Sequence, residues 1–75
     1  MLYRTTYRVE CYHKPSDTWP VIFGGTYGVR AVSVRHALNK MLRIVARMPG
    51  YADRVNHEDW TVTATVSDIT LAENK

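Results

Sequence analysis

The longest helical pattern in the chain runs from Ala31 to Met48. At about 100° per residue, its apolar side chains fall along one stripe and its basic side chains fall on the opposite side. The stripe consists of Val34, Ala37, Leu38, Met41, Val45 and Met48, with Leu42 and Ile44 on its borders. Ser33 is a favourable N-cap and Pro49-Gly50 is a stop signal, so the sequence specifies both helix ends. The pattern predicts one amphipathic helix whose apolar stripe packs on a sheet.

Residues 2–12 alternate in polarity, which is the period of a half-buried strand. One side of this predicted strand carries Tyr3, Thr5, Tyr7, Val9 and Cys11, and the other carries Arg4, Thr6, Arg8, Glu10 and Tyr12. We expect the side with Tyr7 to face the helix and the side with Arg4 and Arg8 to face solvent. Cys11 would then lie in the core.

Residues 13–20 predict a loop, because Pro15 and Pro20 have no backbone N–H to donate to a sheet. Residues 21–32 are apolar and extended in character, but glycines interrupt them. Two interpretations compete: a tight hairpin about Gly24-Gly25, or one bent strand with a glycine bulge that pairs with the first strand. We prefer the bent strand, because the first arm of the hairpin would be too short to contribute much sheet.

Residues 60–66 alternate again and predict a third strand, and the polar residues 51–59 connect it to the helix. A change of phase at Ser67-Asp68 predicts a bulge or turn, and residues 72–75 are expected to form a frayed tail. If the helix runs back across one face of a hairpin, the third strand lies antiparallel beside the first. The sequence therefore predicts a single α+β domain over residues 1–75. Its expected topology is β-β-α-β with strand order 2-1-3 and one amphipathic helix on one sheet face.

Charge is distributed unevenly along the chain, although the net charge of +3 is modest. Residues 1–52 carry eight basic and two acidic side chains, whereas residues 53–75 carry five acidic and two basic ones. This asymmetry suggests an acidic partner for the first part of the chain.

Few residues have catalytic potential. Cys11 is the single cysteine, and a pair formed with His13 or His36 would still need an orienting third group and a cleft. Residues 57–59, His-Glu-Asp, are adjacent and lack a metal-ligand spacing. The glycine-rich residues 24–28 lack the Lys-Ser/Thr of a phosphate loop. We therefore expect no enzyme activity, no cofactor and no metal site.

The start of the chain has no apolar signal region, and no apolar run reaches the roughly 20 residues that span a bilayer. A single cysteine fits a reducing compartment. We expect a cytoplasmic protein without a membrane partner.

The basic side of the predicted helix is the strongest functional candidate, because cations without neighbouring acids bind phosphates or an acidic protein surface. Exposed aromatic side chains near arginines could add a stacking platform for single-stranded nucleic acid. The candidate partner-binding residues are Arg35, His36, Lys40, Arg43 and Arg47 on the helix, Arg4 and Arg8 on the first strand, and Tyr12 and Trp19 near the loop. An ordinary solvated face is the alternative explanation.

The segment Val29-Arg30-Ala31-Val32-Ser33-Val34-Arg35-His36-Ala37-Leu38 resembles a strand-into-helix junction found in very small phage-encoded proteins. Some anti-CRISPR and other host-takeover proteins are similar, with one short helix on a meander sheet. The resemblance extends over residues 3–48. It implies a phage accessory or inhibitor protein without catalytic residues, located in the host cytoplasm.

Three functional hypotheses follow. The first is a non-enzymatic binding module that docks on a larger protein or nucleoprotein with an acidic surface, through the basic helix side and exposed aromatic residues. The second is a small DNA- or RNA-binding protein. The third is a homodimeric structural protein, because so small a sheet leaves an uncovered face and open edge strands.

Overall fold

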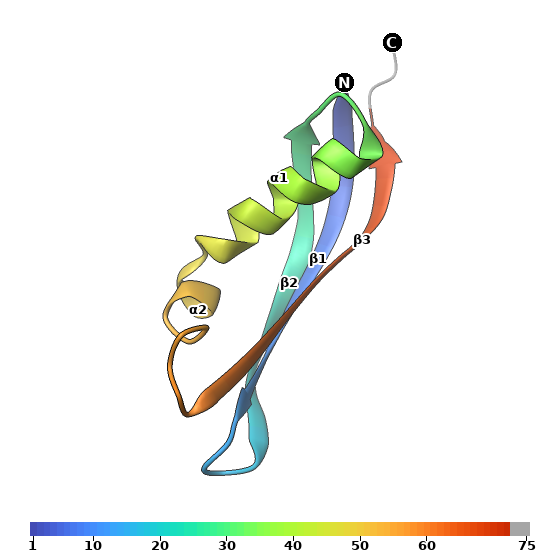
Figure 1. Ribbon diagram of the computed structural model, residues 1–75. Helices are drawn as coiled ribbons and strands as arrows, with labels where there is room; N and C mark the ends of the chain where they lie inside the picture. Colours follow the sequence, from blue (N-terminus) through green and yellow to red (C-terminus); the bar gives the residue numbers. More distant parts are fainter. Residues whose placement is uncertain (73–75) are drawn as a thin grey trace.

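The computed structural model describes residues 1–72, so residues 73–75 of the tail expected over residues 72–75 lie outside the described part. Ala72 is not frayed, because its backbone N–H donates to the carbonyl of Leu2 at 2.8 Å. The central strand β1 (Leu2–His13) pairs antiparallel with β2 (Thr18–Arg30) on one side and with β3 (Trp60–Leu71) on the other. Helix α1 (Val34–Ala46) crosses one face of this sheet (Figure 1). The predicted α+β fold, the β-β-α-β topology and the order 2-1-3 are confirmed.

The β1–β2 turn is shorter than the sequence predicts. Residues 13 and 18 pair with each other, so only residues 14–17 form the turn. Trp19 and Pro20 belong to β2 and lie together opposite Tyr12, where the register shifts by one residue. Prediction of a loop over residues 13–20 was wrong because a bulge accommodates a proline that a regular ladder position would exclude.

Strand β2 continues through its glycines without a turn, which confirms one long strand and rules out the hairpin about Gly24-Gly25. The expected glycine bulge is wrong, because the register with β1 runs unbroken from residue 21 to residue 30. A Cβ atom on Gly24 would overlap the backbone oxygen of Tyr7. Gly24 is therefore explained by the close approach of two strands rather than by a bulge.

The predicted irregularity at Ser67-Asp68 is confirmed as a bulge within one continuous strand. Asp68 has a φ of 50°, and the register with β1 shifts between Arg4 and Thr6. The extra residue lets Val66 and Ile69 both pack against the core, although their sequence spacing is odd. The phase change in the sequence thus keeps one face of β3 apolar.

Both predicted ends of α1 are supported, but the segment after it is different from the prediction. The side chain of Ser33 accepts a hydrogen bond from the backbone N–H of His36 at 3.1 Å, as an N-cap does. After α1 ends, Pro49-Gly50 opens the one-turn helix α2 (Pro49–Ala52). Proline is favourable at a first helical position, so the stop signal for one helix starts the next. The expected plain connector over residues 51–59 therefore begins with helical structure.

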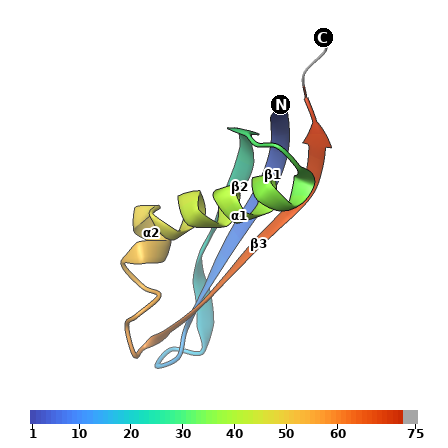
Figure 2. The same ribbon diagram turned by 45° about the horizontal axis from the view of Figure 1, so that its top comes forward.

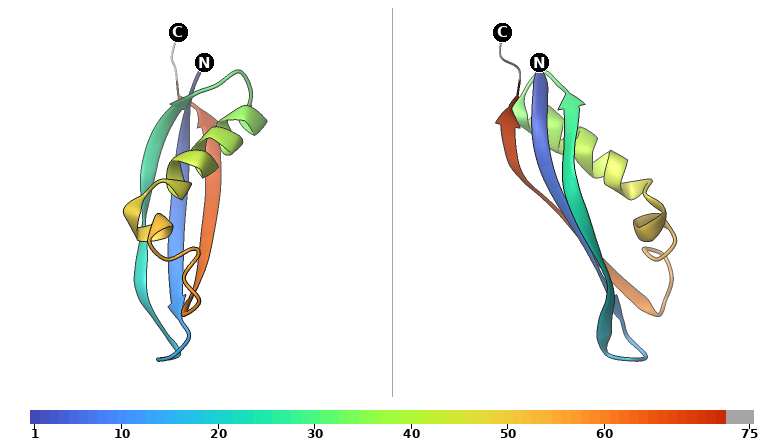
Figure 3. Two further views of the ribbon diagram at one scale, coloured as in Figure 1. Left: turned by 60° about the vertical axis from the view of Figure 1, so that its left-hand side comes forward. Right: turned by 180° about the vertical axis from the view of Figure 1, so that it is seen from behind.

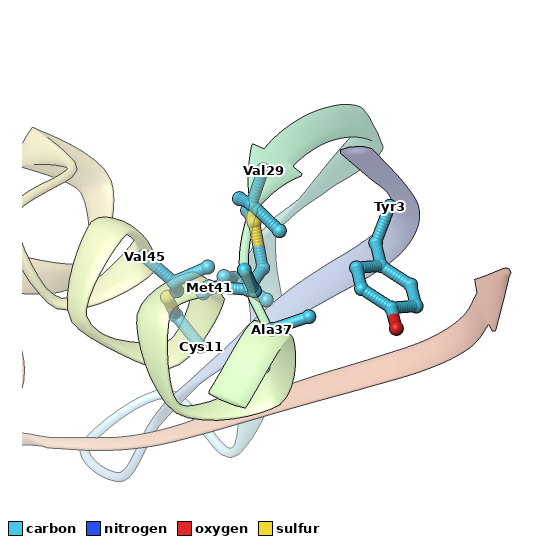
Figure 4. Close-up of a cluster of buried hydrophobic side chains, with 8 residues drawn as sticks. Tyr3, Cys11, Val29, Ala37, Met41 and Val45 are labelled. Carbon is cyan, nitrogen blue, oxygen red and sulfur yellow. The ribbon is translucent and has the colours of Figure 1, made fainter. Parts of the chain in front are cut away.

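The core lies between α1 and the nearer half of the sheet. Its buried apolar side chains are Tyr3, Val9, Cys11, Val29, Ala31, Ala37, Met41 and Val45. Figure 4 shows Met41 in the middle of this cluster, with Tyr3 at one end and Cys11 and Val45 at the other. Thr5 is the one polar residue that is fully buried among those described, and its hydroxyl donates to the carbonyl of Tyr27 at 2.8 Å. The predicted inner side of β1 and the burial of Cys11 are confirmed.

The apolar stripe of α1 is buried over a narrower arc than the sequence predicts, although the buried residues all belong to the predicted stripe. Val34 is 52% exposed, and Leu38 is only half-buried, whereas Ile44 packs against the core. The line of closest contact therefore runs through Ala37, Met41 and Val45. Leu38 and Leu42 lie on the flank of the helix that points away from Lys40.

The described part of the molecule is elongated, with extents of 50 × 17 × 16 Å. Helix α1 begins over the C-terminal end of β3 and passes diagonally across the sheet (Figure 2). The β1–β2 hairpin extends well beyond α1 and α2 (Figure 3). One end of the sheet is thus covered by helix and the other end is bare.

Candidate functional site

The strongest candidate site is a groove on the flank of α1. Its lining consists of Lys40, Arg43, Ile44 and Arg47, and its volume is about 250 Å³. Residues 40, 43, 44 and 47 lie three and four positions apart, so a helix places them on one flank. We refer to these four residues as the basic groove. It joins three cationic side chains to one apolar side chain that also packs on the core.

Lys40 is the anchored member of the basic groove. Its Nζ atom donates a hydrogen bond at 2.6 Å to the backbone carbonyl of Arg30, at the end of β2. This contact places the groove on the β2 side of the helix. It also satisfies an acceptor at a strand end, so Lys40 has a structural role as well as a charge to offer.

Arg43 and Arg47 are the free members of the basic groove. Both side chains are exposed. Within residues 1–72, neither forms a hydrogen bond or an ion pair. Two guanidinium groups without carboxylate partners are available to bind an anion, and each can bind a carboxylate through two parallel hydrogen bonds.

The other two predicted helix residues lie outside the groove. His36 accepts a hydrogen bond at 3.1 Å from the backbone N–H of Val32 through Nδ1, so it helps to hold the start of α1. Arg35 is exposed but lies two helical turns before Arg43, about 12 Å along the axis. The structure therefore brings together three of the five predicted helix residues.

Arg4 and Arg8 project from the sheet face opposite α1, as the sequence predicts. Arg8 donates from Nε to a carboxylate oxygen of Glu10 at 3.0 Å, and its side chain is 61% exposed. The sheet separates these arginines from the basic groove. Positive charge thus occupies two surfaces rather than one.

Tyr12 and Trp19 form an aromatic pair at the hairpin end. Their ring centroids are 5.1 Å apart with the planes tilted by 50°, and Trp19 is 51% exposed. The hydroxyl of Tyr12 donates to the carboxylate of Asp17, and this hydrogen bond raises the pKa of Tyr12. The β1–β2 bulge creates the pair, because it sets Trp19 and Pro20 against Tyr12. The nine predicted residues therefore fall into four regions: the groove, the start of α1, the far face of the sheet and the hairpin end.

A second aromatic cluster, which the sequence analysis missed, lies on the helix-side face of the same end. The rings of His13 and Trp60 are 4.6 Å apart, and the guanidinium of Arg54 lies 4.9 Å from the Trp60 ring centre. Arg54 also donates to the carbonyl of Gly50 at 3.1 Å. Trp60 lies on the same side of β3 as Val62. The alternation of apolar and polar residues in the sequence could have predicted that Trp60 faces the helix side. Arg54 gave no comparable signal, because it lies in the polar residues 51–59, which show no regular pattern.

The described residues show little support for chemistry at the other candidates. Burial raises the pKa of the Cys11 thiol, which favours the unreactive protonated form, and Arg54 offsets part of that effect. His57 uses Nδ1 to accept from the backbone N–H of Asp59 at 3.1 Å. Over residues 1–72, histidine, cysteine and carboxylate side chains form no cluster of three or more that could hold a metal ion. In the same range, α1 and α2 are too short and too polar to cross a membrane.

Comparison of the chain with protein-family models, with curated proteins and with solved structures found no match.

Proposed function

We propose that this protein is a non-enzymatic binding module whose basic groove holds an acidic segment of a partner protein. The observation that carries the proposal is the combination of Arg43 and Arg47, both with side chains without internal partners, with the apolar Ile44 in the same groove. Carboxylates of the partner would pair with the two guanidinium groups. An apolar side chain of the partner would cover Ile44.

The shape and charge of the surface favour protein over nucleic acid. A strand of phosphates is bound through a continuous basic track, and its affinity rises with the number of phosphates that are neutralised. Here the groove offers three cations, and Arg4 and Arg8 lie on the far side of the sheet. A short acidic peptide matches a small groove with an apolar residue better than a nucleic-acid strand does.

The test uses a charge-reversal variant, Arg43→Glu with Arg47→Glu, and a matched control, Arg4→Glu with Arg8→Glu. Both variants change the net charge equally, but only the first alters the groove. The probe is a synthetic peptide of alternating glutamate and leucine, and binding is measured by fluorescence anisotropy over a salt series. We expect the groove variant to bind at least about tenfold more weakly and the control to stay within about twofold. Equal losses in both variants would show that only net charge matters.

Nucleic acid is the competing outcome and has its own signature. A single-stranded oligonucleotide in the same assay would bind more tightly than the peptide. The slope of log affinity against log salt would flatten by about 1 for each phosphate contact removed. The resemblance to small phage accessory proteins agrees with a docking role and stays a prediction, as does the cytoplasmic location.

A further inference from the structure

The two edges of the sheet differ in how they are protected. Edge strands expose unpaired backbone groups, and proteins usually block them with proline, charge or bulges. The β2 edge has Pro20 in a bulge. On the β3 edge, residues 60–67 contain no proline, no glycine and no charged side chain, and the one bulge comes at Asp68. The first two-thirds of β3 therefore form a regular, neutral, open edge within the described chain.

The sequence of this open edge is nearly symmetric. Residues 61–67 read Thr-Val-Thr-Ala-Thr-Val-Ser, which is the same in both directions except that serine replaces threonine at the end. A strand that pairs antiparallel with its own copy meets its own sequence reversed. Such a strand is self-complementary when it is symmetric about one residue. Here that residue is Ala64.

We propose that two copies of this chain pair antiparallel through β3 about a two-fold axis at Ala64. Residues directly opposite each other on two strands have their side chains on the same face of the sheet. A core-facing residue must therefore pair with a core-facing residue of the second copy, and this requires the axis to pass through a residue position. Thr63 then pairs with Thr65 of the second copy, and Val62 pairs with Val66. Threonine pairs and β-branched pairs are both favourable across strands. The product is a continuous six-stranded sheet.

The same pairing covers apolar surface that one chain leaves exposed. Val34 is 52% exposed and Leu42 is 39% exposed, and α1 begins over the C-terminal end of β3 (Figure 2). In the register about Ala64, Val66 of one copy lies opposite Val62 of the other, and both side chains are half-buried within one chain. Because paired residues share a face, both helices lie on the same side of the joined sheet. Each α1 then lies beside apolar residues of the other copy.

The position of the basic groove disfavours the β2 edge for this contact. The basic groove lies on the β2 side, as the bond from Lys40 to Arg30 shows. Pairing through β2 would bring two sets of unpaired cations together, and like charges at an interface oppose association. Pairing through β3 keeps the two grooves apart and open. The dimer would therefore present two copies of the groove to a partner, although its existence does not depend on the function proposed for the groove.

The test compares two variants at the proposed centre. Thr63→Lys with Thr65→Lys places lysine opposite lysine in both symmetric pairs, whereas Thr63→Lys with Thr65→Glu places lysine opposite glutamate. Both positions are exposed on the open face, so neither variant disturbs the core. The control, Ile22→Lys with Thr26→Lys, adds two lysines to exposed positions on the same face of β2. Association is measured by analytical ultracentrifugation from roughly 1 μM to 1 mM.

We expect the wild type to approach twice the 8.6 kDa of one chain as concentration rises. The double-lysine variant should raise the dissociation constant at least about tenfold, and the lysine–glutamate variant and the β2 control should stay within about threefold of the wild type. A wild type that remains monomeric over the whole range overturns the proposal. So does a dimer that both β3 variants disrupt equally, because the register about Ala64 requires the opposite charges to pair. A dimer that the β2 control disrupts as strongly as the double-lysine variant would place the interface elsewhere.

Discussion

The two ends of the sheet are stabilised by different kinds of contact. At the end beneath α1, aliphatic and sulfur-containing side chains such as Met41, Val9 and Val45 are fully removed from solvent. At the hairpin end, rings contact one another while remaining partly exposed, as Trp19 does with Tyr12. Burial of apolar area is the larger stabilising term, so most of the folding free energy should come from the covered end.

The comparison suggests a division of roles within a small chain. A domain of this size buries little apolar surface, and its free energy of unfolding is small. In this chain the buried surface lies mainly beneath the helix. The hairpin end needs only enough contacts to keep its shape, and ring pairs such as His13 with Trp60 supply them. Substitutions at the two ends should therefore differ greatly in their effect on stability.

The largest effect is expected at the centre of the covered end. Met41→Ala should lower the free energy of unfolding by roughly 2–5 kcal/mol, because Met41 is fully buried and its loss leaves a cavity. Urea unfolding followed by circular dichroism, at one low protein concentration, measures the change. Leu38→Ala is the matched control and should cost less than half as much, because Leu38 is half-buried and outside the core cluster. Equal costs would show that Leu38 contributes to the core as much as Met41.

The comparison of Met41 with Leu38 shows which features of the helix could be predicted from the sequence. Periodicity and the Ser33 cap fixed where α1 lies, but the apolar stripe is wide enough to allow several rotations about the helix axis. Only the sheet decides between them, because Ile44 on one border packs on the core, whereas Leu38 toward the other border lies outside the core cluster. The contact joins residues that are far apart in the sequence, so the helix sequence alone does not predict it.

A smaller effect is expected where α2 meets β2. A Cβ atom on Gly50 would lie 2.6 Å from Cε1 and 2.9 Å from Cζ of the Phe23 ring, so the ring or the short helix must move. Overpacking of this kind costs about 1–3 kcal/mol, and the better helix propensity of alanine returns part of it. We expect Gly50→Ala to destabilise by about 1 kcal/mol in the same urea assay.

Gly28→Ala is the control for that prediction. Its added Cβ would make only an ordinary contact of 3.5 Å with a side-chain carbon of Leu2. Since alanine loses less backbone entropy than glycine on folding, this variant should be neutral or slightly stabilising. A Gly28 variant as unstable as the Gly50 variant would mean that backbone strain, rather than the Phe23 contact, explains the loss.

A pH effect is also expected from Cys11 in the core. Burial raises the pKa of Cys11 above its unfolded value, so the folded state holds the thiol proton more tightly. The stabilisation is complete below about pH 8.5, the usual thiol pKa, and is lost as the pH rises through the folded value. Under reducing conditions, the urea midpoint of the wild type should therefore fall above about pH 8.5 more steeply than that of Cys11→Ala. Parallel curves for the two proteins would contradict this burial effect.

The candidate site was predictable in part. Helical spacing alone gathers Lys40, Arg43 and Arg47, because residues three and four apart are neighbours on a helix. The groove also depends on Ile44, which the sequence placed at a border of the stripe, and on the bond between Lys40 and Arg30. The hydrogen bond between Lys40 and Arg30 depends on where β2 ends in space. Short-range pattern cannot supply that information.

The smallest effect is expected at the hairpin end. Trp19 is 51% exposed, and its aromatic contact is with Tyr12 alone among the rings of residues 1–72. Trp19→Ala should therefore change the free energy of unfolding by no more than about 0.5 kcal/mol. Circular dichroism should follow the unfolding, since the substitution removes one of the two tryptophans.

Trp60→Ala gives the contrast at the same end. Trp60 is half-buried and contacts both His13 and Arg54, so its removal should cost clearly more than that of Trp19. If Trp19→Ala instead destabilised as much as Met41→Ala, the hairpin end would belong to the same cooperative core as the helix-covered end. The contrast drawn between the two ends would then be wrong. A small loss, with the fold intact, would leave Trp19 as an exposed aromatic side chain that stability does not require.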